Sequence, residues 1–241
     1  MNAIPDILST AVVAIAGIAI RLLLAAAIVA ALILVLLPFV AGAEALRRVW
    51  LRVAGFEQVA GLTWRSGTYY APVHTWLRRR ARLLRVGFDD IATRVLRQSD
   101  AVSLPAEGAR VNAGDALLTV TSGSRRFSIP APIGGVVHRV NRRLSVHPDA
   151  VIRDPYRRGW LVELAPADEQ YTALPCDLKA RGWFAGEALR LSHALEQGAG
   201  IVAADGGDLV IPPHLAMSDA QLDELVKDFL AARPAPVPGR A

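Results

Sequence analysis

The chain is poor in two residue types that often carry chemistry, cysteine and lysine. Its 241 residues include one cysteine, Cys176, and all but two of its 27 basic residues are arginines. A single cysteine excludes an internal disulfide and a cysteine-based metal cage, so we interpret Cys176 as a small hydrophobic side chain. Lys179 and Lys227 provide the few side-chain amines to which an acyl group could be attached.

Sequence signatures of catalysis are missing as well. The chain contains no nucleophile elbow, no P-loop and no dinucleotide fingerprint. None of its histidines stands three or four residues from another, and none lies in an HExxH element. We therefore predict a protein that is not an enzyme, with no catalytic residues, no metal site and no cofactor. The histidines are His74, His138, His147, His193 and His214.

Charge is absent from one long stretch of the chain. Residues 22–43 contain no Asp, Glu, Lys or Arg and are rich in Leu, Ala, Ile and Val. At about 1.5 Å per residue, a helix of this length measures about 33 Å, close to the thickness of a hydrocarbon core. We predict a transmembrane helix over residues 22–46. Residues 1–21 either continue this helix or form an interfacial segment, and a cleaved signal peptide is disfavoured because no basic region precedes residue 21.

Basic residues are denser after this helix than before it. Arg47, Arg48, Arg52 and Arg65 follow the helix, whereas only Arg21 precedes it. Positively charged segments tend to stay on the cytoplasmic side of a membrane. We therefore expect a single-pass protein of the bacterial inner membrane, with its C-terminal domain in the cytoplasm.

Residues 47–66 are predicted to be a juxtamembrane linker. Their mixture of glycine, aromatic and charged residues suits a connection close to the bilayer. Trp64 fits either an interfacial aromatic belt or a protein core. The residues expected at the membrane interface are Arg21, Arg47, Arg48 and Trp50.

Residues 67–168 are predicted to form a separate, mainly-β domain. Short β-branched runs alternate here with turns rich in glycine and proline, a pattern typical of small all-β units. A short helix is expected after Gly87, where Asp89 or Asp90 can accept hydrogen bonds from the free amides of its first turn. The most distinctive blocks, in order, are residues 73–78, 84–92, 104–115 and 131–137, followed by Asp154-Pro155-Tyr156 and Gly159-Trp160.

In this order the blocks resemble the H-protein of the glycine cleavage system, which is a lipoyl carrier. The resemblance rests on elements such as His74-Thr75-Trp76, Gly114-Asp115 and Ala131-Pro132. It implies a barrel-sandwich hybrid of the lipoyl-carrier kind. The expected fold is therefore an N-terminal transmembrane α-helix, a mainly-β lipoyl/H-protein-like domain and a short α-helical C-terminal extension.

The resemblance breaks down at the residue that a carrier needs most. In the family the lipoylated lysine stands seven residues before the alanine of Ala131-Pro132, and that position is Ser124 here. A hydroxyl cannot form the amide that holds a lipoyl arm, and a shift of one or two residues reaches only Arg125 or Arg126. We therefore predict no lipoyl group. Arg125 and Arg126 are candidates to bind a carboxylate or phosphate of a partner, and the alternative is a solvated basic hairpin.

Residues 169–231 are predicted to be a helical extension, and the proline-rich residues 232–241 a disordered tail. The hydrophobic pattern predicts one helix over residues 183–196 and a second helix that begins at Ser218, with Gln221 completing a capping box. A turn and a short strand are expected between them, at residues 206–213. The second helix has an apolar stripe that packs either on the domain or on another subunit, and its partner-binding candidates are Leu222, Leu225 and Phe229.

These features favour a non-catalytic, membrane-anchored accessory or scaffold subunit of an inner-membrane complex. An electron-transfer, respiratory or photosynthetic complex would suit it, with the degenerate carrier domain used for docking. Its partners would be other subunits of the complex and the lipid bilayer. Nucleic acid is not expected, because no aromatic-interleaved basic stripe accompanies the arginine runs. Two alternatives remain open: an atypical carrier of the H-protein class, and an envelope transport component.

Overall fold

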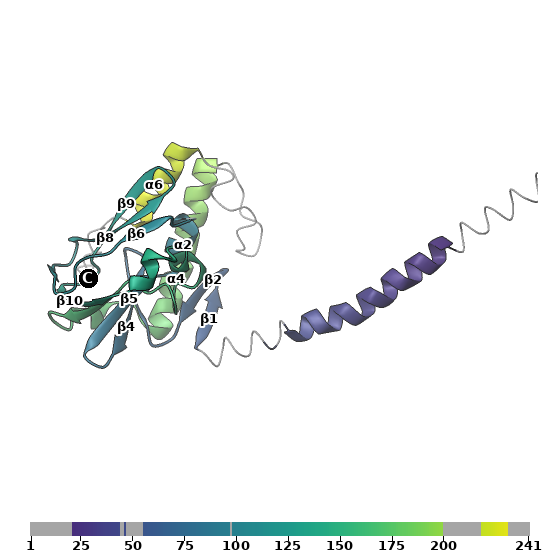
Figure 1. The fold of residues 1–241 in the computed structure, drawn as a ribbon, viewed down its shortest axis with the longest axis horizontal. Coiled ribbons are helices and arrows are strands. Elements are labelled where there is room, and N and C mark those ends of the chain that lie inside the picture. Colours follow the sequence, from purple (N-terminus) through teal and green to yellow (C-terminus); the bar gives the residue numbers. More distant parts are fainter. Residues whose placement is uncertain (1–20, 44–45, 47–54, 97, 200–217, 231–241) are drawn as a thin grey trace, which may run out of the picture. The chain divides into compact units, whose positions relative to one another are not determined.

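The computed structural model describes residues 21–43, 46, 55–96, 98–199 and 218–230 (Figure 1). The chain divides into two compact units, Met1–Ala54 and Gly55–Ala241. In the first unit, Arg21–Ala43 form a helix of 23 residues whose side chains are all exposed. Its length and apolar composition suit a membrane span, and a signal sequence near an N-terminus has the same properties. The predicted interfacial segment before Arg21 lies outside the described residues, as do Arg47, Arg48 and Trp50.

The second unit is built on two antiparallel sheets and a separate hairpin. The larger sheet has six strands in the order β3-β4-β5-β11-β10-β7, and the smaller has three in the order β6-β8-β9. The hairpin joins β1 to β2. The strands are β1 (Phe56–Val59), β2 (Leu62–Arg65), β3 (Tyr69–Ala71), β4 (Thr75–Arg80), β5 (Leu83–Phe88), β6 (Ala101–Ser103), β7 (Arg110–Val111), β8 (Ala116–Ser122), β9 (Arg125–Pro130), β10 (Gly135–Val140) and β11 (Val162–Pro166).

The larger sheet buries one of its faces. Along β5, Leu84, Val86 and Phe88 are at most 1% exposed, whereas Arg85 points to the other face and is partly exposed. Successive side chains of a strand point to opposite faces, so this alternation marks the core side of the sheet. Ile129 of the smaller sheet is fully buried as well and belongs to the same apolar core.

Four helices complete the described part of this unit. They are α2 (Asp90–Leu96), α3 (Ala150–Arg153), α4 (Asp177–Ala199) and α6 (Asp219–Leu230), with 3₁₀ turns η1 (Arg142–Ser145) and η2 (Gln170–Ala173). The helix expected over residues 183–196 is confirmed and extends further at both ends. The elements observed are those of the expected fold class: an apolar N-terminal helix, a mainly-β domain and C-terminal helices. The turn and strand expected at residues 206–213 and the tail at 232–241 lie outside the described residues.

Residues 55–66 do not form the linker that the sequence predicted. They make the hairpin β1–β2, and the compact unit begins at Gly55. Leu62 and Trp64 are 1% and 2% exposed, and Tyr156 packs edge-on against Phe56 with ring centroids 5.6 Å apart. Trp64 is therefore a core residue, because the hairpin folds back on the domain instead of leading away from it.

Gly87 lies where β5 passes beneath an indole ring. It pairs directly with Trp76 of β4, and a Cβ added to Gly87 would come within 2.4 Å of Trp76 Cζ2. Trp76 is 1% exposed and stacks on Tyr156 at 5.8 Å, so the indole has little room to move. We expect Gly87→Ala to lower the free energy of unfolding by about 1–3 kcal/mol through overpacking. Urea unfolding followed by circular dichroism would measure the loss.

Gly186→Ala provides the matched control for this substitution. Gly186 lies within α4, and a Cβ added there meets nothing within 4 Å. Alanine is favoured over glycine inside a helix by roughly 0.5–1 kcal/mol, so this variant should be slightly more stable than the wild type. A Gly87→Ala variant as stable as the wild type would show that Trp76 can move aside.

The C-terminal helices pack on the β-domain through aromatic side chains. Phe184 of α4 meets Tyr70 of β3 edge-on, with ring centroids 4.7 Å apart. Trp183, also on α4, lies 5.3 Å from the His74 ring, and Phe229 of α6 stacks on the same ring at 5.5 Å. The extension is therefore part of the domain's packing.

Helix α6 begins as the sequence predicted, but its apolar stripe has a different role. The Ser218 amide donates to Gln221 Oε1 at 2.8 Å and the Gln221 amide to Ser218 Oγ at 3.4 Å, which confirms the capping box. Leu222, Leu225 and Phe229 are between 1% and 7% exposed, because α6 lies against α2 and β9 (Figure 1). Their assignment as partner-binding residues was wrong: the stripe is buried by its own chain, the other alternative that the pattern left open.

Candidate functional site

The β8–β9 hairpin carries Ser124, which stands where the resemblance puts a lipoylated lysine. Ser122 pairs with Arg125, which leaves Gly123 and Ser124 as a two-residue loop. Gly123 has a φ of +60°, the conformation that the first central residue of a type II′ turn requires. The Asp100 carboxylate supports the loop by accepting a hydrogen bond of 2.6 Å from the Gly123 amide. Ser124 is exposed at the tip, where it presents a hydroxyl and no amine.

The two arginines after this loop have different surroundings. Arg125 Nε lies 3.2 Å from Asp223 Oδ1 on α6, and the Arg125 side chain is only 21% exposed. Arg126 points to the opposite face of β9 and is exposed. Arg125 therefore joins the hairpin to the C-terminal helix. A carboxylate of the same chain thus already pairs with Arg125, and binding of a partner's anion by Arg125 or Arg126 stays a prediction.

A buried charged cluster joins the β-domain to both C-terminal helices. His74, in the turn between β3 and β4, is fully buried, and its Nδ1 lies 3.0 Å from Asp89 Oδ2. Its Nε2 lies 3.5 Å from Glu187 Oε2 on α4. Glu187 also pairs with Arg190, whose guanidinium lies 4.1 Å from the centre of the Phe229 ring on α6.

Asp89 contributes both to this cluster and to α2. Its Oδ1 accepts hydrogen bonds from the amides of Ile91 and Ala92 at 2.9 and 3.0 Å, while its Oδ2 contacts His74. Asp89 is thus the cap of α2. The sequence offered either Asp89 or Asp90 as the cap of this helix. The cap is Asp89, since Asp90 is the first residue of the helix itself.

The neighbouring carboxylates determine the charge of His74. Burial lowers the pKa of His74, but the charges and hydrogen bonds of Asp89 and Glu187 outweigh it and raise the pKa above its usual 6.5. For Glu187 burial raises the pKa, whereas His74 and Arg190 bring it below its usual 4.5 overall. The two carboxylates therefore favour the protonated form of His74 over the neutral one.

The cluster predicts a pH optimum of stability. A His74 pKa raised by folding contributes stability that is complete below about 6.5 and is lost as the pH rises through the folded-state pKa. The lowered pKa of Glu187 contributes stability that is complete above about 4.5 and is lost as the pH falls through its folded-state pKa. We expect the cluster to stabilise the domain most between about pH 4.5 and 6.5. Thermal unfolding midpoints across the pH range would measure this.

Two histidine variants make the measurement specific to the cluster. In His74→Asn the decline in stability above about pH 6.5 should be missing, because no imidazolium is left to lose its proton. Asparagine tolerates the φ of +52° at this position. His138→Asn, which changes an exposed histidine, should keep the wild-type profile. If the decline persists in His74→Asn, a different group causes it.

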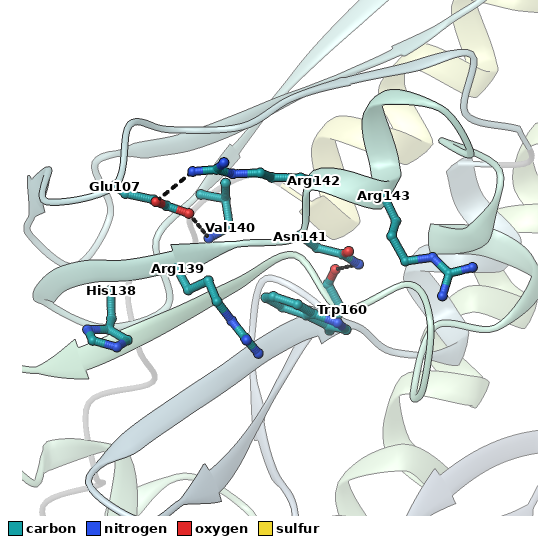
Figure 2. A pocket seen from close by; sticks show the side chains of 8 residues that line it. All are labelled: Glu107, His138, Arg139, Val140, Asn141, Arg142, Arg143 and Trp160. Atoms are coloured by element: carbon teal, nitrogen blue, oxygen red, sulfur yellow. Dashed lines mark hydrogen bonds and ion pairs between the residues drawn. The ribbon is translucent and has the colours of Figure 1, made fainter.

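An open hollow lies beside β10 (Figure 2). Two of its arginines are already paired, Arg142 with Glu107 and Arg139 with Glu163, each at 3.0 Å. Asn141 donates to two backbone carbonyls, each at 2.7 Å. We assign no ligand to this hollow, because most of its polar groups are satisfied within the chain. It measures ≈ 520 Å³ and is lined by Glu107, His138, Arg139, Val140, Asn141, Arg142, Arg143 and Trp160.

Known proteins match the central part of this chain. The profile of the Glycine cleavage H-protein family matches residues 68–178. Over 112 residues the chain is 38% identical to the glycine cleavage system H protein of Legionella pneumophila (strain Corby), covering 42% of this chain and 90% of that protein. Over 104 residues it is 34% identical to the probable glycine cleavage system H protein of Thermoplasma acidophilum, covering 43% and 83%.

A solved structure resembles part of this chain as well. The glycine cleavage system H protein of Mycobacterium marinum shares 27% sequence identity and a TM-score of 0.41, covering 46% of this chain and 97% of that one. The N-terminal helix, α6 and all but the start of α4 lie outside the family match. The resemblance read from the sequence blocks is confirmed: through residues 68–178, this chain belongs to the glycine cleavage H-protein family.

Proposed function

We propose that this chain is a membrane-tethered member of the H-protein family that carries no lipoyl group and serves as a docking module. The proposal rests on the lack of a lysine side chain in the part of the chain that matches the family. Neither Lys179 nor Lys227 lies within residues 68–178, and Ser124 stands at the tip of the β8–β9 hairpin, where the resemblance puts the lipoylated lysine. H proteins are carriers and not catalysts, so a member without that lysine would retain only the carrier's scaffold.

The C-terminal helix supports a docking role over a carrier role. The Arg125–Asp223 ion pair and the buried stripe of α6 hold this helix against the hairpin strand β9. This places α6 next to the hairpin tip, beside any enzyme that would receive a group there. A helix held against the hairpin suits a domain that binds a partner with a fixed surface better than one that passes on a carried group.

The N-terminal helix supports the tether. Arg21–Ala43 comprise 23 residues, more than the roughly 20 that a membrane span needs. The arginines that follow it favour a cytoplasmic domain on a bacterial inner membrane. We propose that its partners are other subunits of an inner-membrane complex of the electron-transfer kind.

Intact-mass measurement of protein from native membranes tests the loss of carrier chemistry. We expect the mass of the unmodified chain even when the cells receive excess lipoate. An H protein that has its lysine, produced in the same cells, should gain a lipoyl group and serves as the control. A lipoyl-sized increment on Lys179, Lys227 or any other residue would overturn the proposal and favour an atypical carrier.

Fractionation tests the tether, the orientation and the partners. The full chain should stay in the membrane pellet after carbonate extraction, and a chain without residues 1–46 should not. Protease should digest the domain in inverted vesicles but not in right-side-out vesicles. Purification in mild detergent should recover other membrane subunits in fixed ratio. Release by carbonate, digestion from outside or purification of the chain alone would each contradict the corresponding part of the proposal.

A further inference from the structure

The outer face of the larger sheet carries more positive charge than its acidic neighbours among the described residues neutralise. Arg78 of β4 pairs in register with Arg85 of β5, Arg85 with Glu163 of β11, and Glu163 with Arg139 of β10. One carboxylate thus lies in a row with three guanidiniums and pairs with two of them. Both of its oxygens are occupied, Oε1 by Arg85 at 2.6 Å and Oε2 by Arg139 at 3.0 Å. No acidic oxygen of this row is left for Arg78.

Arg78 has no acidic partner among the residues that the structure describes. It is partly buried, its Nε makes no hydrogen bond, and its guanidinium lies 5.7 Å from the centre of the Trp76 ring. Three other arginines lie near enough to lower its pKa, namely Arg65, Arg80 and Arg85, while Tyr70 acts in the opposite direction. Burial and these like charges lower the pKa of Arg78 to about 10. A half-dehydrated cation among like charges is stabilised by an anion from outside the chain.

Arg65 and Arg80 extend this positive surface. Arg65 ends β2 and lies over Phe56, 5.1 Å from the ring centre, while Arg80 ends β4 and is exposed. Arg78 and Arg80 are two residues apart on β4 and share a face of the sheet. The Arg65 amide donates to Tyr70 Oη at 2.7 Å, and Tyr70 pairs in register with Trp76, whose ring lies beside the Arg78 guanidinium. We call Arg65, Arg78 and Arg80 the arginine patch.

The length of the connecting chain limits what can face this patch. Only residues 44–54 separate the N-terminal helix from Gly55. At 3.3–3.6 Å per residue, such a segment spans at most about 40 Å in any conformation. If the helix crosses a bilayer as proposed above, the domain stays within reach of the lipid surface, and contact with that surface becomes an intramolecular event.

We propose that the arginine patch docks the domain on anionic lipid headgroups of the membrane that the N-terminal helix spans. Guanidinium groups bind phosphate oxygens through paired hydrogen bonds. Lipids diffuse laterally, so their phosphates can adjust to three cations without a preformed complementary surface. The inference rests on the proposed tether and adds a second, electrostatic contact to it.

Nanodiscs allow the full chain to be tested in a defined bilayer. The chain would carry Cys176→Ser and one fluorophore on Arg82→Cys, an exposed position in the turn after β4. The discs would contain phosphatidylcholine alone or mixed with phosphatidylglycerol, each with a nitroxide-labelled headgroup lipid as quencher. We expect strong quenching only in the anionic discs, and its loss at high salt. A fluorophore on Ser124→Cys, at the β8–β9 tip, reports whether quenching is confined to the patch.

A charge-matched pair of variants identifies the residues responsible. Each basic residue near an anionic surface contributes roughly a fivefold change in affinity. The combination Arg65→Gln, Arg78→Gln and Arg80→Gln should therefore shift the equilibrium roughly a hundredfold toward the undocked domain and abolish quenching. Circular dichroism would confirm that the domain is folded. The control substitutes glutamine for three exposed arginines elsewhere and should retain quenching: Arg126, Arg143 and Arg181.

The possible outcomes separate this inference from the tether. Equal quenching in both lipids, no quenching, or equal loss in the control variant would overturn lipid docking by the patch. If lipid composition has no effect but the patch variant loses a protein that co-purifies with the wild type, the patch binds an acidic protein and lipid docking is wrong. A chain that fails to enter nanodiscs contradicts the tether itself.

Discussion

Replacing Ser124 by lysine should let this chain accept a lipoyl group, which under the function proposed above the wild type does not carry. The loop retains the geometry of a hairpin tip, with Gly123 in its positive-φ conformation and Asp100 bonded to the Gly123 amide. Ser124 is exposed, so a lysine there would extend into solvent. Intact mass after production with lipoate and a lipoyl-attaching enzyme should show a modified Ser124→Lys chain and an unmodified wild type.

Two further variants show whether the tip itself is recognised. Ser128→Lys places an amine on the exposed face of β9, beyond the loop, and should stay unmodified. Adding Asp223→Asn to Ser124→Lys breaks the ion pair with Arg125 and should speed modification if α6 hinders access. A folded Ser124→Lys chain without a lipoyl group would contradict the assignment of this position. Arg125→Lys and Arg126→Lys would then test the neighbouring registers.

Replacing Asp89 by alanine should strongly destabilise the β-domain. If His74 is protonated in the folded domain, the change leaves a fully buried imidazolium without its nearest carboxylate, a loss typically of about 3–5 kcal/mol. It also removes the cap of α2, worth about 1 kcal/mol. Since α2 packs on α6, we expect the C-terminal helix to loosen as well. Urea unfolding near pH 6, followed by circular dichroism and tryptophan fluorescence, would measure the loss.

The variant Asp89→Asn separates the loss of the carboxylate charge beside His74 from the loss of the α2 cap. Asparagine caps a helix about as well as aspartate, so this variant keeps α2 capped and removes only the charge that faces His74. It should be more stable than Asp89→Ala by about 1 kcal/mol and still clearly less stable than the wild type. An Asp89→Asn variant as stable as the wild type would show that His74 is uncharged in the folded domain.

Features that depend on a few neighbouring residues could be predicted before the fold was known. An uninterrupted apolar stretch predicted the N-terminal helix, and the Ser218–Gln221 spacing predicted the start of α6. Ordered glycine and proline blocks predicted the β-domain and its family. The same blocks located Ser124 between two strands, and the structure places it in the loop of a hairpin. These features follow from local backbone preferences and periodicity, which a linear pattern records.

Contacts between groups far apart in the chain could not be predicted and became known from the fold. Trp64 could suit a membrane interface or a core, and the packing of β1–β2 buried it. The apolar stripe of α6 had to be covered, but its pattern did not say by what. Arg125 pairs with Asp223 on α6. His74 lies beside Glu187 on α4, a helix that follows the whole β-domain in the chain. Ion pairs of this kind depend on how segments far apart in sequence fold together, and no local signal encodes that.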